Sequence, residues 1–487
     1  MSVFAGIDLG TSGIKIVLAD AGGACLTSAA RPCPVDRPHP GWSQQDPRVW
    51  WDLVGEIFDE LAARDPGLMA RLAAISLSGQ MLGAVLLDAS DVPVTPCILW
   101  NDQRSLMECA VLLGRVPDIG RRANGQPDPG LTAPKLLWLA EHAPGDLARA
   151  DVLMLPKDYV RLRLTGARGS DISDASGTMM MDCASGTWDA ELVAAAGWDM
   201  ARLPDLAPSH AVAGVLLPDL CRRWGTPAEV RVAMGCGDNY AGALGVGAAA
   251  AGDAALSIGT SGVLSAVDGA FHPAPESAVL TTPHAAPDTY LSMGVVMSAT
   301  QSLDWVAELT GTAAETLAAE AQARVAARGL AGFPLARPSL TGVRTPDNRP
   351  DAGAVFSGLS AVTDKVDLAY AVMEGVAFQF YDAARAQSAA GVPIARITAV
   401  GGGARSALWL ELIASLLEVP LEVPQHGDIS ACLGAAKLAQ AAVEPQALGE
   451  ILGRRQPQQT VAEPVAEWLE VLRARHARYR ELPFHGV

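Results

Sequence analysis

Short apolar runs that end in glycine turns recur along the chain, and stretches with a helical period separate them. Residues 3–19 read as two strand-like runs around the turn Gly10-Thr11-Ser12-Gly13, and Gly22-Gly23 predicts a hairpin into a third strand. A helical period follows over 47–64. The pattern therefore opens with strands joined by tight turns and covered by an amphipathic helix.

The turn of the first hairpin occurs a second time. Residues 255–265 read A-L-S-I-G-T-S-G-V-L-S, an apolar strand, a Gly-Thr-Ser-Gly turn and another apolar strand. Repeats of a solenoid recur every 20 to 50 residues or so, whereas these two turns lie far apart. The repetition therefore predicts two related halves, residues 1–247 and 248–487, that face each other across a cleft.

Further elements follow from the same patterns. A buried strand at 74–78 is expected to resume at 84–87, and helices are expected at 132–143 and 155–164, with another starting at Trp188. In the second half we expect strands at 290–296 and 396–400, helices at 313–328, 365–391, 408–417 and 430–441, and a helical tail.

Length, charge and cysteine content narrow the class of protein. The 487 residues exceed the roughly 250 to 300 at which single cores stop growing, so two domains are expected. A net charge of −17 argues against nucleic acid or an anionic membrane surface as a partner. The eight cysteines are scattered, which favours free thiols in a reducing cytoplasm. The N-terminus enters a strand at once and does not resemble a signal peptide, so a cytoplasmic location is expected. Charges in the helical stretches argue against a membrane span.

Candidate chemistry concentrates between Met234 and Gly262. Asp238 stands among glycines before a helix start, where its carboxylate can act as a base. The turn Gly259-Thr260-Ser261-Gly262 offers backbone N–H groups and two hydroxyls to a phosphate. Asp8, at the end of the first strand, is a natural anchor for Mg²⁺, although a turn-stabilising role fits it too.

A second group of polar residues follows strand ends in the first half. Gln80, Met81 and Leu82 can line a pocket, although packing explains the last two almost as well. Trp100 offers a flat face to a sugar, and Asp102, with Arg104, offers partners to hydroxyls. A helix-capping acid beside an exposed arginine is the alternative for that pair.

Three weaker signals remain. Three glycines at 401–403 between a strand and a helix allow a ligand to approach the backbone, although a glycine triplet alone is weak evidence. Asp174 and Ser176 can face the cleft, or they can serve as ordinary loop and cap residues. Lys15 can reach a phosphate, or it can simply lie at the edge of a strand.

Five pieces in order, GIDLGTSG, SGQM followed by LWNDQR, GCGDN, SIGTSG and GGGARSALW, together resemble the FGGY family of carbohydrate kinases over essentially the whole chain. Within that family, ISLSGQM, CILWNDQR and GCGDN look most like the xylulokinase branch. The resemblance implies two α/β domains of the ribonuclease-H-like type, as in actin, sugar kinases and the Hsp70 ATPase, flanking a deep cleft. Sugar would bind mainly to residues 1–247 and ATP mainly to residues 248–487.

The resemblance also implies roles for individual residues. Asp238 matches the base that takes the proton of the attacking hydroxyl, and Asp8 matches the carboxylate associated with Mg²⁺; both are candidate metal ligands. The sugar side would comprise Gln80, Met81, Leu82, Trp100, Asp102 and Asn239. The ATP side would comprise Thr11, Ser12, Lys15, Gly259, Thr260, Ser261, Gly402, Gly403, Ala404 and Ser406.

One departure from the branch bears on the substrate. Xylulokinases usually read G-Q-M-H-G, with a histidine that contacts the sugar, and Leu82 stands in its place here. Sites built to pair hydroxyls discriminate by about 10⁴ to 10⁵ against analogues that lack them, so the preferred sugar can differ from D-xylulose. Tyr240 after Asn239 also looks unusual and can reshape the same pocket.

The expected activity is ATP- and Mg²⁺-dependent phosphorylation of a pentulose. D-xylulose, converted to D-xylulose 5-phosphate, is the leading candidate substrate, and another ketose or a polyol is the alternative. The chain lacks G-x-x-x-x-G-K-[ST] and the protein-kinase motifs, so other common ATP-binding solutions are absent. A non-catalytic sugar sensor and an actin-like or chaperone ATPase are the rivals from other classes. A homodimer is the commonest soluble assembly, but the sequence does not fix the oligomeric state.

Overall fold

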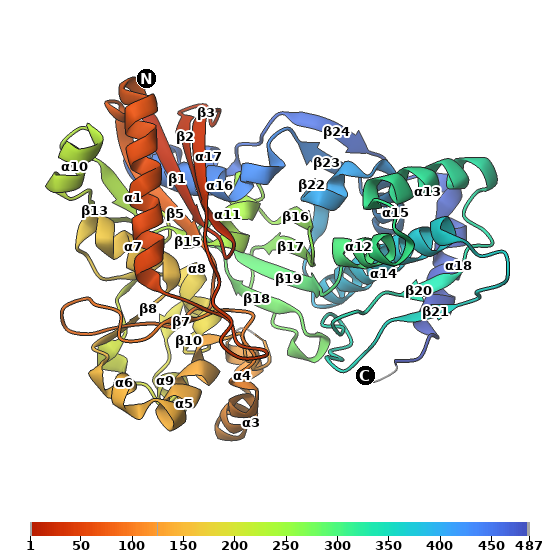
Figure 1. Ribbon diagram of the computed structural model, residues 1–487, viewed down its shortest axis with the longest axis horizontal. Coiled ribbons are helices and arrows are strands. Elements are labelled where there is room, and N and C mark those ends of the chain that lie inside the picture. Colours follow the sequence, from red (N-terminus) through yellow and green to blue (C-terminus); the bar gives the residue numbers. More distant parts are fainter. Residues whose placement is uncertain (1, 124, 485–487) are drawn as a thin grey trace.

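Two seven-stranded sheets, one from each half of the chain, form the centres of two lobes in the computed structural model, which describes residues 2–123 and 125–484 (Figure 1). The first sheet has the order β13 (Val212–Val215), β14 (Arg231–Ala233), β5 (Leu72–Gly79), β1 (Val3–Leu9), β2 (Gly13–Asp20), β3 (Cys25–Pro32), and β15 (Cys236–Gly237) also pairs with β5. The second has the order β18 (Leu280–Pro283), β19 (Tyr290–Val296), β17 (Gly262–Asp268), β16 (Gly252–Ile258), β22 (Ile394–Val400), β23 (Leu421–Pro424), β24 (Gln458–Ala462).

Helices cover the sheets and fill the space between them and the shorter strands. The helices are α1 (Pro47–Arg64), α2 (Pro66–Met69), α3 (Leu106–Arg115), α4 (Ile119–Arg122), α5 (Thr132–His142), α6 (Pro144–Arg149), α7 (Pro156–Thr165), α8 (Ile172–Ala175), α9 (Ala190–Ala195), α10 (Pro218–Trp224), α11 (Asp238–Gly245), α12 (Thr300–Thr310), α13 (Ala314–Arg328), α14 (Lys365–Ala389), α15 (Ala407–Leu417), α16 (Ser430–Val443), α17 (Leu448–Gly453) and α18 (Leu469–Arg480). The short strands are β4 (Gln44–Gln45), β6 (Val85–Leu87), β7 (Cys97–Ile98), β8 (Val152–Met154), β9 (Ser170–Asp171), β10 (Met181–Asp182), β11 (Thr187–Trp188), β12 (Leu206–Ala207), β20 (Leu335–Arg337) and β21 (Val355–Ser357).

The two sheets repeat one pairing pattern. In the first, β1 is antiparallel to β2, β2 is antiparallel to β3, and β1, β5 and β14 run parallel. In the second, β16, β17 and β19 form the same antiparallel set, and β16, β22 and β23 run parallel. The two Gly-Thr-Ser-Gly turns join β1 to β2 and β16 to β17, at equivalent places. The prediction of two related α/β halves is confirmed.

Apolar faces explain why these segments pack as they do. Helix α1 starts at Pro47 behind the cap Asp46, whose carboxylate accepts from the N–H of Arg48. Its Trp50, Val54 and Phe58 are fully buried in one core with strands β1, β2 and β5. Burial of such side chains contributes roughly 1.5–3 kcal/mol each, so this stripe fixes the helix on the sheet.

Helix α16 comes from the second half of the chain but packs on the first sheet. It contacts β1, β5 and β2, and it crosses α11 (Figure 1). Glycines allow the close crossing, because a Cβ on Gly434 would lie 1.9 Å from the carbonyl oxygen of Ala241 and one on Gly245 would lie 1.9 Å from that of Ser430. The small residues of this segment thus bring two backbones together between the lobes.

We expect Gly434→Ala to destabilise the protein by about 1–3 kcal/mol, because the added methyl group forces α11 and α16 apart. Gly242→Ala is the matched control on α11, since a Cβ there meets no heavy atom within 4 Å. That control should be neutral or more stable by about 0.4–1 kcal/mol. Urea unfolding midpoints measure both, and equal midpoints for the two variants would contradict the close crossing.

Polar contacts also join the lobes. Arg344, in the irregular segment before β21, forms an ion pair with Asp128 of the first lobe. The hydroxyl of Tyr290 donates to the carbonyl of Ala184 at 3.1 Å, and Lys15 Nζ donates to the carbonyl of Asp428 at 3.1 Å. The lobes therefore touch at several separate places.

Three sequence predictions about elements are wrong. Residues 85–87 do not continue β5, because β6 pairs with β8 in a separate two-stranded sheet. Trp188 lies in β11, and the helix begins at Ala190 behind the cap Asp189. The tail is not wholly helical, since β24 closes the edge of the second sheet beside β23.

Candidate active site

Three parallel strands of the first sheet end at the same level and carry candidate residues there. Asp8 of β1 and Cys236 of β15 both stand opposite Ser78 of β5. Gln80 follows β5, and Asp238 follows β15. The carboxyl ends of parallel strands are the usual ligand-binding edge of such sheets. The fold thus brings Asp8, Gln80 and Asp238 together.

Asp238 is the first residue of α11, directly after the cap Gly237. Burial raises the pKa of its carboxyl to about 7, and the negative charge of Asp8 adds to this. The side chain is half-buried, so one side remains open to solvent, and one oxygen accepts from the N–H of Asn239 at 2.8 Å. A carboxylate with a pKa near 7 is suited to accept and release a proton at neutral pH.

Asp8 shares this environment but has stabilising partners. Burial raises the pKa of its carboxyl, while a hydrogen bond from Ser78 Oγ at 2.9 Å and the positive charge of Lys15 lower it. Lys15 stands opposite Asp8 on β2. The pair Asp8 and Asp238 therefore forms an oxygen-rich, electronegative end of the sheet.

The turn after β1 connects to the sugar side of the candidate site. Trp100 Nε1 donates to Thr11 Oγ1 at 3.0 Å, and Thr11 Oγ1 donates to Gln80 Oε1 at 2.9 Å. Gln45 completes the network, because its Oε1 accepts from Gln80 at 2.8 Å and its Nε2 donates to the carbonyl of Thr11 at 2.9 Å. The hydroxyl of Thr11 is thus held between two sugar-side candidates, while Ser12 is exposed.

Leu82 adopts a left-handed conformation with a φ of 73°. Its carbonyl accepts from Thr132 Oγ1 at 3.0 Å and from the buried Lys135 Nζ at 2.9 Å. Its side chain fills the space over Gly177, where a Cβ would lie 2.3 Å from Leu82 Cδ2. Leu82, which replaces the expected histidine, is therefore held both by hydrogen bonds to its carbonyl and by the packing of its side chain.

The remaining sugar-side candidates differ in exposure. Trp100 is 46% exposed and Asn239 is exposed, with its amide nitrogen 3.8 Å from the sulfur of the buried Met81. Asp102 is fully buried and its two oxygens accept from Arg104 and from the N–H of Ser43. The carboxylate of Asp102 thus positions Arg104.

In the second lobe, the two candidate ATP-binding turns follow adjacent parallel strands. Gly259 follows β16 and Gly401 follows β22, and Ser257 stands opposite Val400. Gly401 has a φ of 95°, and a Cβ there would lie 2.6 Å from the carbonyl oxygen of Ile258, so glycine is required. The two turns are neighbours at one edge of the second sheet.

The side chains of these turns divide into exposed and structural ones. Thr260 and Ser261 are exposed, and Gly402 is exposed beside the buried Gly403 and Ala404. Ser406 caps α15 by accepting from the N–H of Trp409 at 3.4 Å. The hydroxyls of Thr260 and Ser261 remain exposed at this turn, whereas the N–H of Gly259 donates to the carbonyl of Ser261 at 3.0 Å.

Sequence reasoning missed a buried charge cluster in the first lobe. Lys157 Nζ lies 2.7 Å from Asp158, 2.8 Å from Asp171 and 3.1 Å from Asp174, and all four side chains are fully buried. Asp174 was expected to face the cleft as one alternative, but it belongs to this cluster. Gln45 was also missed, and its only signal was its place just before the helix start at Pro47.

Tyr240 bridges the lobes. Its buried hydroxyl lies 3.1 Å from Ser176 Oγ in the first lobe and 2.8 Å from Thr282 Oγ1 on β18. The residue that looked unusual in the sequence therefore packs inward and links β18 to the segment after α8.

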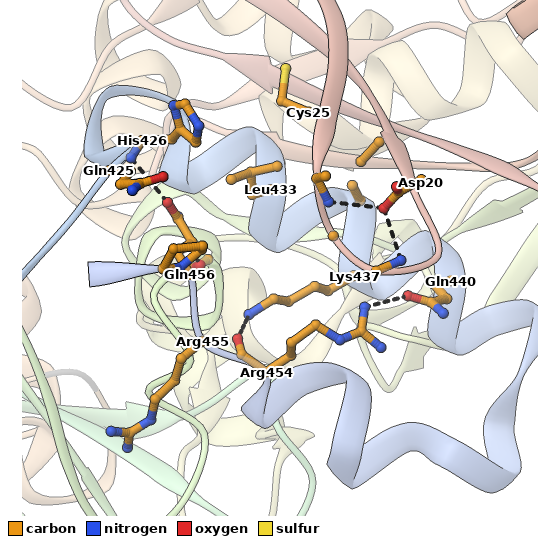
Figure 2. A pocket seen from close by; sticks show the side chains of 17 residues that line it. Asp20, Cys25, Gln425, His426, Leu433, Lys437, Gln440, Arg454, Arg455 and Gln456 are labelled. Atoms are coloured by element: carbon orange, nitrogen blue, oxygen red, sulfur yellow. Dashed lines mark hydrogen bonds between the residues drawn. The ribbon is translucent and has the colours of Figure 1, made fainter. Parts of the chain in front are cut away.

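A separate hollow of about 290 Å³ lies between the hairpin of β2 and β3 and the segment that follows α17 (Figure 2). None of the predicted site residues lines it. Lys437 crosses it and donates to the carbonyls of Arg454 and Leu244, the latter at 2.5 Å, as Figure 2 shows for Arg454. Lys437 thus ties the ends of α11 and α17 together, which is a structural role.

Comparisons with known proteins place the chain in a family. Residues 3–245 match the N-terminal domain of the FGGY family of carbohydrate kinases, and residues 254–443 match its C-terminal domain. A curated xylulose kinase of Escherichia coli (strain K12) is 41% identical over 446 residues, 91% of each chain. Among the described residues, none of the helices combines the length and apolar character that a membrane span needs.

Solved structures agree. The crystal structure of a xyloylose kinase from Brucella ovis superposes with a TM-score of 0.94 at 40% identity, covering 98% of each chain. A gluconate kinase from Lactobacillus acidophilus superposes with a TM-score of 0.90 at 26% identity, covering 99% of this chain and 97% of that one. The chain belongs to the FGGY family of carbohydrate kinases.

Proposed function

We propose that this kinase transfers the terminal phosphate of ATP to D-xylulose and forms D-xylulose 5-phosphate. The observation that carries the proposal is the 41% identity to a xylulose kinase over nine-tenths of both chains. The paired Asp8 and Asp238 at the strand ends supply the chemistry that such a reaction needs. In this proposal residues 1–247 bind mainly the sugar and residues 248–487 bind mainly the nucleotide.

Asp238 is the general base in the proposed reaction. With a pKa near 7 and one open side, it can take the proton of the attacking hydroxyl as the oxygen approaches the terminal phosphorus. Trp100, Asn239 and the segment Gln80–Leu82 would hold the sugar, with Asp102 acting through Arg104. Contacts between the lobes would exclude water, which otherwise competes as the acceptor.

The nucleotide side consists of backbone and hydroxyl groups. The exposed turn Gly259-Thr260-Ser261 would hold phosphates, with Thr11, Ser12 and Lys15 facing it from the first lobe. The segment Gly402–Ser406 would hold the adenosine. Positioning and charge stabilisation are most of what phosphoryl transfer asks of a protein.

The residues fit a Mg²⁺ ion at Asp8 and Asp238. The negative charge of Asp8 raises the pKa of Asp238, a divalent cation between the two carboxylates would offset this repulsion, and carboxylate oxygens are the ligands Mg²⁺ prefers. When bound, the ion would neutralise charge on the phosphates. The chain's own residues would still orient the sugar and remove its proton.

A panel of sugars tests the proposal. Release of ADP is measured with D-xylulose, D-ribulose, L-ribulose, gluconate and glycerol, and D-xylulose is expected to give the highest kcat/KM. The alternative, a kinase for another sugar or polyol, is favoured by Leu82 and by the likeness to a gluconate kinase. Release of ADP with none of these sugars would contradict the substrate proposal and favour a non-catalytic sensor.

We expect Leu82→His to raise kcat/KM for D-xylulose about tenfold, because the imidazole restores a hydroxyl partner. The backbone tolerates the change, since histidine adopts a left-handed φ more readily than leucine does. The same assay measures the effect, and Leu82→Met is the control that adds no hydrogen bond. Equal values for the two variants would show that residue 82 does not contact the sugar.

Two further proposals concern the cytoplasmic location and the oligomeric state of the enzyme. All eight cysteines are free thiols, which fits a reducing cytoplasm. We expect a homodimer, the commonest assembly, and light scattering after size-exclusion chromatography measures the mass.

A further inference from the structure

Helices α3 and α5 pack against each other in the first lobe and bring three potential metal ligands together. Glu108 lies in the first turn of α3, and Glu141 and His142 are the last two residues of α5. One ligand atom from each lies within 4.8 Å of the others. None of the three is among the candidate residues for phosphoryl transfer.

Glu108 is the buried member of this group. The residue is only 8% exposed, and its Oε2 has no hydrogen-bond partner among the residues that the structure describes. Burying a carboxylate oxygen without a partner is unfavourable, so buried carboxylates are normally paired or bound to a metal. The neighbouring ligand atoms come from Glu141 and His142, which are both exposed.

His142 has the tautomer and orientation of a metal ligand. Its Nδ1 lies 3.0 Å from the carbonyl oxygen of Trp138. A carbonyl only accepts, so Nδ1 carries the proton and Nε2 presents its lone pair. The ring also stacks on Trp138 at 4.4 Å between centroids with an angle of 6°. Histidines that bind metals commonly have their second nitrogen held by a carbonyl or carboxylate in this way.

We propose that Glu108, Glu141 and the Nε2 of His142 bind a divalent transition-metal ion of the Zn²⁺ class. One imidazole with two carboxylates suits Zn²⁺ or Co²⁺ better than Mg²⁺, which prefers oxygen alone. Bonds of about 2.0–2.2 Å require ligand atoms roughly 3.0–3.6 Å apart, so the two exposed side chains close by about 1 Å onto Glu108.

The site would brace the wall of the sugar-binding segment. Trp138 packs edge-on against Trp42 with centroids 5.3 Å apart, and the guanidinium of Arg104 lies 3.7 Å from the Trp42 ring centroid. Arg104 is in turn paired with the buried Asp102. A metal that fixes α3 to α5 therefore holds the stack that supports residues 100–104, and its role is structural.

The test is titration of the full-length protein, free of sugar and nucleotide, with Co²⁺, followed by calorimetry and by visible absorption. We expect one Co²⁺ per chain at this site, with absorption typical of nitrogen and oxygen ligands and lacking thiolate bands. His142→Phe, which keeps the stacking on Trp138, Glu108→Gln and the exposed Glu141→Gln should each weaken binding at least about tenfold. Wild-type activity with Mg²⁺ and ATP in each variant shows that the fold is kept.

His39→Phe is the matched control, because His39 is exposed and packs edge-on against Trp42 at 4.6 Å in the same aromatic group. It should bind Co²⁺ as the wild type does. The proposal is overturned if the wild type binds no Co²⁺ up to millimolar concentration or if the three ligand variants keep wild-type affinity. It is equally overturned if Asp238→Asn removes the binding or millimolar Mg²⁺ displaces the ion.

Discussion

Replacing Asp238 with asparagine is expected to lower kcat for sugar phosphorylation by about 10²–10⁴ while the affinity for ATP stays within about twofold. Asparagine keeps the size of the side chain and the hydrogen bond from the N–H of Asn239, but it cannot accept the proton of the attacking hydroxyl. A sugar-dependent ADP-release assay measures turnover, and calorimetry measures ATP binding. Wild-type turnover in the variant would remove Asp238 from the role of base.

The pH profile provides an internal check on that prediction. Burial and the charge of Asp8 raise the pKa of Asp238 to about 7, and the base works only when it is deprotonated. The wild-type kcat/KM should therefore fall as pH falls through about 7, and the residual activity of Asp238→Asn should lack this fall. Asp102→Asn is a suitable comparison, because Asp102 is buried against Arg104 and its loss should raise KM for the sugar without changing the pH profile.

Much of the fold could be predicted from local patterns, because hairpin turns and helix starts are determined by residues that are close together in the sequence. The turns at Gly10 and Gly259 each require a hairpin, and the alternation around them predicted β1, β2, β16 and β17 in the right places. The helix predicted at 365–391 closely matches α14, since Asp364 and Asp367 form a capping box that starts it. Repetition of one turn was enough to predict two related halves.

Long-range pairing could not be predicted in this way. The sequence places α16 in the second half, yet its small residues pack it on the first sheet across α11. The short strand β6 has the same apolar character as β5, and only its partner β8 separates it from that sheet. Such choices depend on residues distant in sequence, which a local period does not contain.

The candidate site shows the same division. The positions of Asp8, Gln80 and Asp238 at strand ends follow from local patterns, because a polar residue after a buried strand marks the ligand edge of a sheet. The direction of a side chain does not follow, and Asp102 was expected toward the sugar but lies inward against Arg104. The sequence analysis gave Lys157 no role, because nothing near it in sequence indicates the acid groups of Asp171 and Asp174.

Replacing Lys157 with methionine is expected to lower the free energy of unfolding by about 3–5 kcal/mol, because it leaves buried carboxylates without their shared cation. Lys157 lies within 3.1 Å of Asp158, Asp171 and Asp174, and all these side chains are fully buried. Urea unfolding measures the loss. Lys365→Met is the matched control. Within the part of the chain that the structure describes, the side chain of Lys365 makes a single hydrogen bond, to the Thr312 hydroxyl at 3.0 Å. Its replacement should therefore change the free energy of unfolding by less than about 0.5 kcal/mol.

Replacing different acids of this cluster should lower the free energy of unfolding by different amounts. Unequal losses distinguish specific charge pairing from a general sensitivity of the core to substitution. Burial raises the pKa of Asp174 to about 8, so this carboxyl is mostly protonated at pH 7 and asparagine resembles it closely. Lys157 and Arg161 hold the pKa of Asp158 below its ordinary value despite its burial, so this group is charged. Asp158→Asn should therefore cost several times more stability at pH 7 than Asp174→Asn does. Equal losses for the two variants would contradict the assignment of the negative charge to Asp158.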